Sequence, residues 1–142
     1  MINIRQELEV AKRASKIAAA LLIDNKDNIN KILSNEGRDV KLKADLESEK
    51  VIKEYLLANS NFPILAEESG ANQDLGNSFW VVDPLDGTSN YSRDFPICCI
   101  SIALIHENEI TLGVINDFNR GSLYEGSINQ KAKLNGADIF VS

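Results

Sequence analysis

Four short strand-like runs joined by tight turns fill the last third of this 142-residue chain. Apolar residues dominate each run, and turns such as "HENE" and "NRG" separate them, a pattern that favours neighbouring antiparallel strands. The predicted strands span 96–106, 109–117, 122–127 and 131–136. This segment commits the chain to an antiparallel meander.

Before the meander, the spacing of apolar residues changes between the helical period and the alternation typical of strands. Over residues 3–24, apolar residues recur at helical spacing with charged residues on the other side, which predicts one long amphipathic helix. A second helix is predicted over 46–58, with Asp45 where an N-cap would lie. Between the helices, 28–34 and 39–45 alternate apolar and polar residues around the turn "NEGR" and predict a hairpin.

Composition limits the class of protein. With 44% apolar and 25% charged residues, the chain is expected to form one globular domain with a real core. A net charge of −6 without clustered Lys and Arg argues against a nucleic-acid surface. The early apolar run 17–23 is too short to cross a membrane, and no signal-peptide cleavage site follows it. Cys98 and Cys99 should point to opposite faces of a strand as core thiols, which favours a reducing cytoplasm.

Two further strands, expected at 63–68 and 78–83, both end in carboxylates. "PILAEE" ends on two glutamates, "SFWVVD" ends on Asp83, and Asp86 lies three residues further on. If the two strands are neighbours, three or four carboxylates converge, and such a cluster needs a cation because like charges repel. Oxygen ligands without His or Cys select a hard cation, Mg²⁺ before Zn²⁺.

The residues that follow Asp83 suggest a phosphate site. Pro84 has no N–H to donate and is expected to end the strand. Gly87 lets the backbone approach a ligand closely, and the amides of Gly87 and Thr88 would point at a phosphate oxygen if they open a helical turn. The alternative interpretation is an ordinary turn after a strand, without a role in binding. Together with the carboxylates, this motif indicates metal-assisted phosphoryl transfer with water as the nucleophile.

The motif "DPLDGTSNY" at 83–91, with "AEES" at 66–69, resembles the signature of the inositol monophosphatase family of Mg²⁺-dependent, lithium-sensitive phosphatases. The segments "RDVKLKADLESE", "FPICCISIALI" and "GSLYEGSINQKAKLNGADIFVS" resemble further family segments, so that the resemblance covers essentially the whole chain. It implies an α/β fold of the layered α+β kind. Residues 1–142 would be a single domain, the N-terminal portion of the family's α-β-α-β-α sandwich, with long helices followed by a mostly antiparallel sheet.

The resemblance also implies metal ligands that spacing alone does not place. Glu67, Asp83 and the main-chain carbonyl of Leu85 would hold a first Mg²⁺ ion. Asp83 and Asp86 would bridge to a second ion, and Asp45 would lie near a third. The implied cofactor is therefore two or three Mg²⁺ ions, with Li⁺ as an inhibitor.

Catalytic roles follow from the same resemblance. Thr88, its hydroxyl paired with Asp45, would orient the attacking water, and Glu67 completes the implied catalytic set. Gly87, Thr88 and Asp86 would bind the substrate, the two amides by holding its phosphate. Structural roles are the simpler interpretation for four other residues. Glu68 would be a solvated residue beside the site, Asn90 and Tyr91 would close the turn, and His106 would face solvent at a strand end.

Two local departures from the family pattern are visible: Leu42 replaces the family's threonine before Asp45, and "SINQKAKLNG" lacks the family's usual glycines. The greater departure is length, and the W-D-x-A motif of the family's second half is absent, since Trp80 is the only tryptophan. Family members usually have about twice this many residues, so the C-terminal half is expected to be absent here. One face of the sheet would then be left uncovered.

Three functions remain open. The leading hypothesis is a hydrolase, a Mg²⁺-dependent phosphatase that acts on myo-inositol 1-phosphate or a similar small polyol or sugar phosphate. The enzymatic alternative is 3′(2′),5′-bisphosphate nucleotidase or fructose 1,6-bisphosphatase activity, although "DGTSNY" favours the inositol phosphatase branch. The third is an inactive truncated fragment or metal-binding module. The resemblance further implies a homodimer and a small phosphorylated substrate. Charge and hydropathy predict neither nucleic acid nor membrane as a partner.

Overall fold

The computed structural model describes residues 2–29, 32–36 and 39–141, and within these it leaves out the side chains of residues 28–41. Its helices and strands follow one another along the chain as α1 (Ile4–Asp24), α2 (Lys26–Ile29), β1 (Ile32–Glu36), β2 (Asp39–Leu42), α3 (Lys43–Asn59), β3 (Ile64–Ala66), β4 (Gly70–Ala71), β5 (Phe79–Asp86), α4 (Thr88–Ser92), β6 (Cys99–His106), β7 (Glu109–Asp117), β8 (Ser122–Ser127), β9 (Gln130–Leu134) and β10 (Ala137–Asp138).

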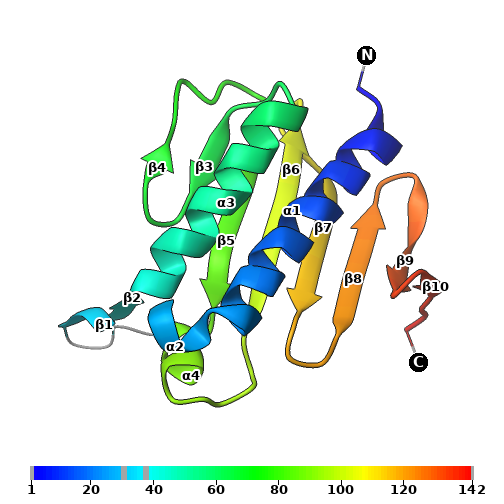
Figure 1. The fold of residues 1–142 in the computed structure, drawn as a ribbon. Coiled ribbons are helices and arrows are strands. Elements are labelled where there is room, and N and C mark those ends of the chain that lie inside the picture. The colour runs from blue at the N-terminus through cyan, green and yellow to red at the C-terminus, as the bar shows by residue number, and fades with distance from the viewer. Residues whose placement is uncertain (1, 30–31, 37–38, 142) are drawn as a thin grey trace.

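Eight of the strands form a single mixed sheet in the order β10-β9-β8-β7-β6-β5-β3-β4 (Figure 1). The strands from β5 to β9 pair antiparallel with their neighbours, which confirms the predicted meander. β3 instead runs parallel to β5, with Leu65 opposite Val81. The carboxyl ends of β3 and β5 therefore lie side by side, as the sequence interpretation required.

The first helix is confirmed, and the boundaries after it differ from prediction. Asn3 caps α1, because its Oδ1 accepts the N–H of Gln6 at 3.1 Å. The predicted hairpin exists as β1 and β2, and its turn at 37–38 lies outside the described residues. It is shorter than predicted, because α2 takes up residues 26–29 and α3 begins at Lys43.

Asp45 is not the N-cap of the second long helix, so that prediction is wrong. Leu42 occupies the cap position, and Asp45 is the third helical residue. The Asp45 carboxylate accepts the Leu42 N–H at 3.0 Å, which satisfies one of the free amides at the start of α3. The Leu42 side chain is fully buried, so the leucine that replaces the family threonine serves the core while Asp45 supplies the polar contact.

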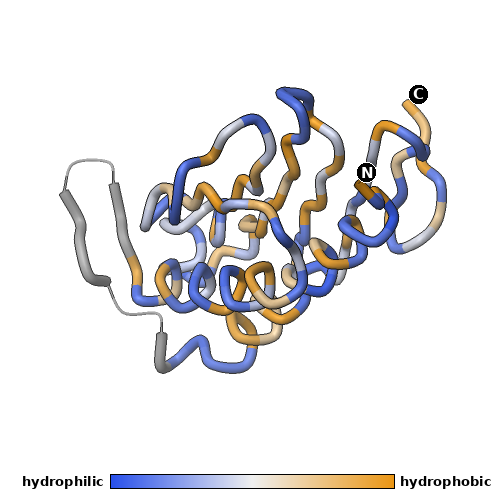
Figure 2. The backbone as a smooth tube through the Cα atoms, turned by 90° about the horizontal axis from the view of Figure 1, so that it is seen from above, coloured by the Kyte–Doolittle hydropathy of each residue, from blue (hydrophilic) through white to orange (hydrophobic). Residues whose placement is uncertain are grey.

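Helices α1 and α3 pack against one face of the sheet and enclose the core (Figures 1 and 2). Alternation along β5 turns Trp80 and Val82 toward the helices, and both are buried. Ala14 and Ala18 of α1 are fully buried, and their small size lets the helix lie close to the sheet. Burial of each large core side chain contributes about 2 kcal/mol.

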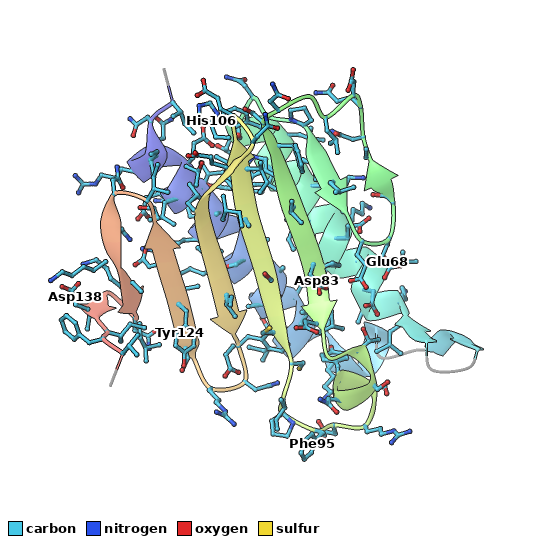
Figure 3. All side chains as sticks on the ribbon, turned by 180° about the vertical axis from the view of Figure 1, so that it is seen from behind. Glu68, Asp83, Phe95, His106, Tyr124 and Asp138 are labelled. Atoms are coloured by element: carbon cyan, nitrogen blue, oxygen red, sulfur yellow. The ribbon has the colours of Figure 1, made fainter. Side chains whose placement is uncertain are left out.

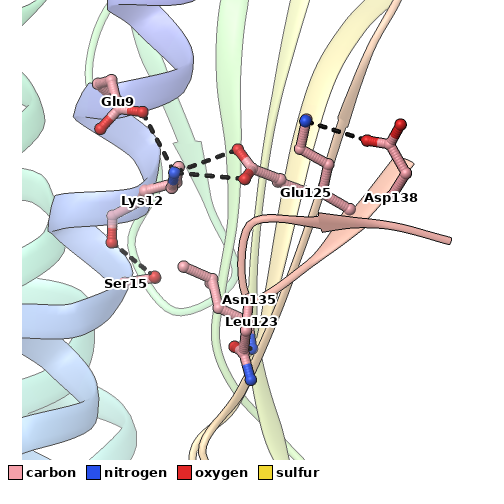
Figure 4. Close-up of polar contacts among 8 residues, drawn as sticks. Glu9, Lys12, Ser15, Leu123, Glu125, Asn135 and Asp138 are labelled. Atoms are coloured by element: carbon pink, nitrogen blue, oxygen red, sulfur yellow. Dashed lines mark hydrogen bonds and ion pairs between the residues drawn. The ribbon is translucent and has the colours of Figure 1, made fainter. Parts of the chain in front are cut away.

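Polar contacts fix the position of α1 over the sheet. Lys12 Nζ lies 3.2 Å from Glu9 Oε1 and 3.3 Å from Glu125 Oε2 on β8 (Figure 4). Nearby, Asn116 of β7 donates from Nδ2 to Ser15 Oγ at 3.3 Å. Because Glu125, Ser15 and Asn116 are all buried, these contacts satisfy polar groups that would otherwise destabilise the interface.

The opposite face of the sheet has no helix over it in the described part of the chain (Figure 3). Ile115 and Tyr124 project from this face and are 46% and 38% exposed. Together with Ile128 and Ile139 they surround an apolar hollow of about 590 Å³. No described helix has both the length and the apolar character needed to cross a membrane.

Two smaller predictions about strand ends are corrected. Pro84 does not end β5: the strand continues to Asp86, with a bulge between Asp83 and Asp86 that absorbs the missing N–H. His106 is not simply solvent-facing. Its Nδ1 lies 3.0 Å from Ser78 Oγ, and its ring packs edge-on against Phe62 with centroids 5.8 Å apart.

Candidate active site

The carboxyl ends of β3 and β5 bring two of the predicted carboxylates into contact. The main-chain N–H of Glu67 donates to the carbonyl of Val82 at 3.2 Å, which extends the parallel pairing by one residue. The side chains of Glu67 and Asp83 then share a hydrogen bond, which raises the pKa of Glu67 to about 7, and burial and the negative charges of neighbouring acids add to the shift. Near neutral pH, Glu67 can therefore hold a proton against Asp83.

A second contact joins the start of α3 to the turn after β5. The Thr88 hydroxyl donates to Asp45 Oδ1 at 2.9 Å and lies 3.2 Å from the Leu85 carbonyl oxygen. Asp45 is 2% exposed, and burial raises its pKa to about 6 although the hydrogen bonds from Leu42 and Thr88 oppose the shift. The pairing of Thr88 with Asp45, implied by resemblance, is present.

The turn between β5 and α4 needs glycine at one position. Gly87 has φ +92°, and a Cβ atom there would lie 2.8 Å from the carbonyl oxygen of Ile97 and 3.0 Å from the Cβ of Cys98. Thr88 opens α4 directly after it, as the motif suggested. Asn90 closes the turn by donating from Nδ2 to the Ile97 carbonyl at 2.7 Å, which agrees with the structural role expected for it.

The hydroxyl of Tyr91 reaches outside the turn. It donates to the Leu22 carbonyl of α1 at 2.7 Å, and the side chain is almost fully buried. This contact ties the short helix α4 to the end of α1. Tyr91 therefore has the structural role that the sequence suggested.

Two residues of α3 support the site and were not singled out by sequence reasoning. Ser48 Oγ donates to the Pro84 carbonyl at 2.7 Å, and Glu49 Oε1 accepts the N–H of Glu68 at 2.8 Å. Both side chains are buried and hold the two strand ends against the helix. The signal was available, since Asp45, Ser48 and Glu49 follow one another at the i, i+3, i+4 spacing of a single helix face.

Asp86 does not join the other carboxylates. Its Oδ2 lies 3.9 Å from the Sγ of Cys99, toward the neighbouring strand β6. Burial and the nearby charges of Asp86, Asp83 and Asp117 raise the pKa of the Cys99 thiol to about 11, so this cysteine stays protonated. Cys98 and Cys99 are free thiols, consistent with the expected lack of a bond between them.

The convergence of three or four carboxylates is therefore only partly met. Within the described residues, no three His, Cys, Asp or Glu side chains come together in a group that could hold a metal ion. The physical reason is repulsion: Glu67 and Asp83 tolerate each other through a shared proton, and the bulge at Pro84 turns Asp86 toward Cys99.

The donor set that is present fits a hard cation. Glu67 and Asp83 offer carboxylate oxygens within contact of each other, and the Leu85 carbonyl lies at the same turn, where its own N–H donates to Asp83 Oδ1 at 3.3 Å. Carboxylates held together by a proton are suited to exchange that proton for a divalent cation. No imidazole or thiolate contributes, which favours Mg²⁺ over Zn²⁺.

Comparisons with known sequences and structures point to one family. The sequence pattern of the inositol monophosphatase family matches residues 3–142. The chain is 34% identical over 144 residues to an inositol-1-monophosphatase from Synechocystis sp., covering 99% of this chain and 50% of the relative. It is 38% identical over 140 residues to the Nus factor SuhB of Xylella fastidiosa, covering 95% of this chain and 50% of the relative.

A solved structure agrees in fold. The inositol monophosphatase from Anabaena superimposes with a TM-score of 0.84 at 31% identity, covering 99% of this chain and 51% of that one. The chain thus spans about half the length of the curated relatives it matches. Its helices followed by a mostly antiparallel sheet, with "DPLDGT" at the end of a strand, have the expected layout, and the chain belongs to the inositol monophosphatase family.

Proposed function

We propose that this chain carries the phosphate-binding and water-activating part of a Mg²⁺-dependent phosphomonoesterase that acts on a small polyol or sugar phosphate. The observation that carries the proposal is the contact of Glu67 with Asp83 at the adjoining ends of β3 and β5. It supplies two carboxyl groups, of which Glu67 would give up its proton when a cation binds, beside a turn whose backbone can approach a phosphate.

The cation would be held by Glu67, Asp83 and the Leu85 carbonyl, with Asp86 available to a second ion after a side-chain rotation. When bound, Mg²⁺ supplies a water of lowered pKa and neutralises charge on the phosphate. Thr88 would orient a water, and the support for this role is that the buried carboxylate of Asp45 accepts the hydrogen bond of its hydroxyl. That buried acid, with its pKa raised to about 6, can accept a proton through the hydroxyl.

The phosphate would lie over the amides of Gly87 and Thr88. The left-handed conformation of Gly87 starts the short helix α4, and its lack of a Cβ lets the backbone pass the Ile97 carbonyl. The chain is otherwise acidic, with a net charge of −6, so these amides and the cation would provide the local positive potential that an anion requires.

We further propose that residues 1–142 are one domain equivalent to the N-terminal portion of longer family members. One continuous core between the helices and the sheet supports this division. The free cysteines suit a reducing compartment such as the cytoplasm. Homodimer formation stays a prediction from the resemblance.

The alternative functions need the same test. A bisphosphate, either 3′-phosphoadenosine 5′-phosphate or fructose 1,6-bisphosphate, would use the same metal ligands, so the carboxylates do not separate these substrates. A relative named as a Nus factor rather than a phosphatase also means that membership of the family does not by itself fix the reaction. An inactive metal-binding module would keep Glu67 and Asp83 without turnover.

The experiment is phosphate release by the purified chain from myo-inositol 1-phosphate and the two bisphosphates, with and without Mg²⁺. We expect Mg²⁺-dependent release that Asp83→Asn lowers by at least about 10²-fold, since a cation ligand is lost. Asp138→Asn is the matched control, because Asp138 lies on β10 and pairs with Lys133. A folded chain that releases no phosphate, or an Asp83→Asn variant as active as the unaltered chain, would refute the proposal.

A further inference from the structure

A cavity of about 330 Å³ continues from the proposed phosphate site across the sheet. Asp86 and Gly87 line one side, Cys99 forms part of the floor, and Asp117 and Arg120 line the opposite side. The part of a substrate beyond its phosphate would occupy this cavity. Its far wall belongs to the β7–β8 turn, to which neither the motif nor the family resemblance assigns a role.

Strand register fixes how far the two sides are apart. Asp86 pairs with Cys99, and Ile100 pairs with Asn116, so Asp117 lies level with Cys99 in the next strand. Asp86 and Asp117 are therefore two strand spacings apart, about 10 Å. Because Asn116 faces α1, alternation turns Asp117 to the other side of the sheet, where the cavity lies. This span suits a six-membered ring that carries a phosphate at one end.

Charge at the far wall is dominated by the carboxylate. Arg120 Nε lies 3.7 Å from Asp117 Oδ2, and the Arg120 side chain is 66% exposed whereas that of Asp117 is 22% exposed. A ligand inside the cavity therefore meets the carboxylate in a less screened position than the guanidinium. With Asp86 assigned to the cation, the charge that faces a ligand at the far wall is that of Asp117 beside the more exposed Arg120.

The turn that carries this pair is held in place. Arg120 N–H donates to the Asp117 carbonyl at 3.1 Å. Asn119 Nδ2 lies 3.3 Å from the Sγ of Cys98 and 3.4 Å from the Pro96 carbonyl, which fastens the turn to the segment before β6. A fixed carboxylate can accept a hydroxyl hydrogen bond at low entropic cost and will repel an anion.

We propose that Asp117, with Arg120 beside it, is a specificity-determining residue that accepts a hydroxyl of a neutral polyol and disfavours a second phosphate on the same substrate. The inference rests on the proposed function, because it places the first phosphate at Gly87. It deepens that function by assigning the residue that would discriminate against a second phosphate.

The test is calorimetric binding of two ligands that differ only in the second phosphate, myo-inositol 1-phosphate and myo-inositol 1,4-bisphosphate, to the whole chain in saturating Ca²⁺, which also takes oxygen ligands; phosphate release in Mg²⁺ is followed separately. We expect the monophosphate to bind at least about tenfold more tightly. Asp117→Asn should reduce that ratio to about threefold or less through tighter binding of the bisphosphate. Asp138→Asn removes the same charge away from the cavity and should leave the ratio unchanged.

Three results would overturn the inference: a bisphosphate preference in the unaltered chain, an Asp117→Asn ratio within about twofold of the unaltered one, or no binding of either ligand. The outcome is separable from that of the proposed function. Selective binding without phosphate release leaves the selectivity standing and removes the phosphatase. Phosphate release together with an unchanged affinity ratio in Asp117→Asn leaves the phosphatase standing and removes the role of Asp117 in selectivity.

Discussion

At the scale of single residues, the protonation of two acids governs the proposed site. The hydrogen bond with Asp83 raises the pKa of Glu67 to about 7, and burial raises the pKa of Asp45 to about 6. Both groups therefore hold protons more tightly in the folded chain than in the unfolded chain. Their stabilising contribution is complete below about pH 4 and is lost as the pH rises through the folded pKa values.

We predict that, without divalent cations, the unfolding temperature of the chain decreases as the pH is raised from about 5 to about 8. Over this range Glu67 and Asp45 ionise in the folded state, where one adjoins Asp83 and the other is buried. Thermal unfolding followed by circular dichroism measures the slope. Glu67→Gln should reduce the slope to the part that Asp45 contributes, and Asp138→Asn, on β10 and paired with Lys133, should keep the full slope. A rising unfolding temperature, or a full slope in Glu67→Gln, would contradict the assignment.

At the scale of elements, the turn from β5 into α4 is the most constrained piece of the site. Gly87 combines φ +92° with backbone and side-chain atoms 2.8 and 3.0 Å from the position of a Cβ. The neighbouring atoms belong to Ile97 and Cys98 at the approach to β6, so relief would require moving a strand of the core sheet. Both strain and collision therefore oppose any other residue here.

Gly87→Ala should lower the free energy of unfolding by about 3 kcal/mol, from left-handed strain together with the steric contact. Denaturant unfolding measures this change. Gly126→Ala is the matched control, because no atom lies within 4 Å of the place that its added Cβ would take and its φ is not left-handed. We expect that control to change stability by less than about 1 kcal/mol. Equal effects of the two substitutions would refute the argument.

The elements also show what periodicity can predict. The long first helix and the meander were predictable, because a 3.6-residue or two-residue repeat continues over many residues. Helix and strand boundaries that depend on a single contact were not predictable. α3 begins three residues earlier than predicted because Asp45 accepts the Leu42 N–H, and β5 passes Pro84 through a bulge. Such local contacts leave no repeat in the sequence.

At the scale of the whole molecule, one sheet separates a helix-covered core from an open apolar face (Figures 1 and 3). The candidate site lies where the carboxyl ends of β3 and β5 meet α3 and α4. Sequence reasoning predicted that these two strand ends would be neighbours, and β3 pairs with β5 as required. It could not predict that Asp86 turns toward Cys99, because the direction of that side chain depends on the bulge.

The central claim is that Glu67 and Asp83 form a Mg²⁺ site, and calorimetric titration of the chain with Mg²⁺ tests it most directly. Asp138→Asn is the control, because Asp138 lies on β10 away from the site and pairs with Lys133. The account predicts Mg²⁺ binding that Glu67→Gln weakens by at least about tenfold and Asp138→Asn by less than about twofold. Absence of Mg²⁺ binding, or equal weakening by both substitutions, would contradict it.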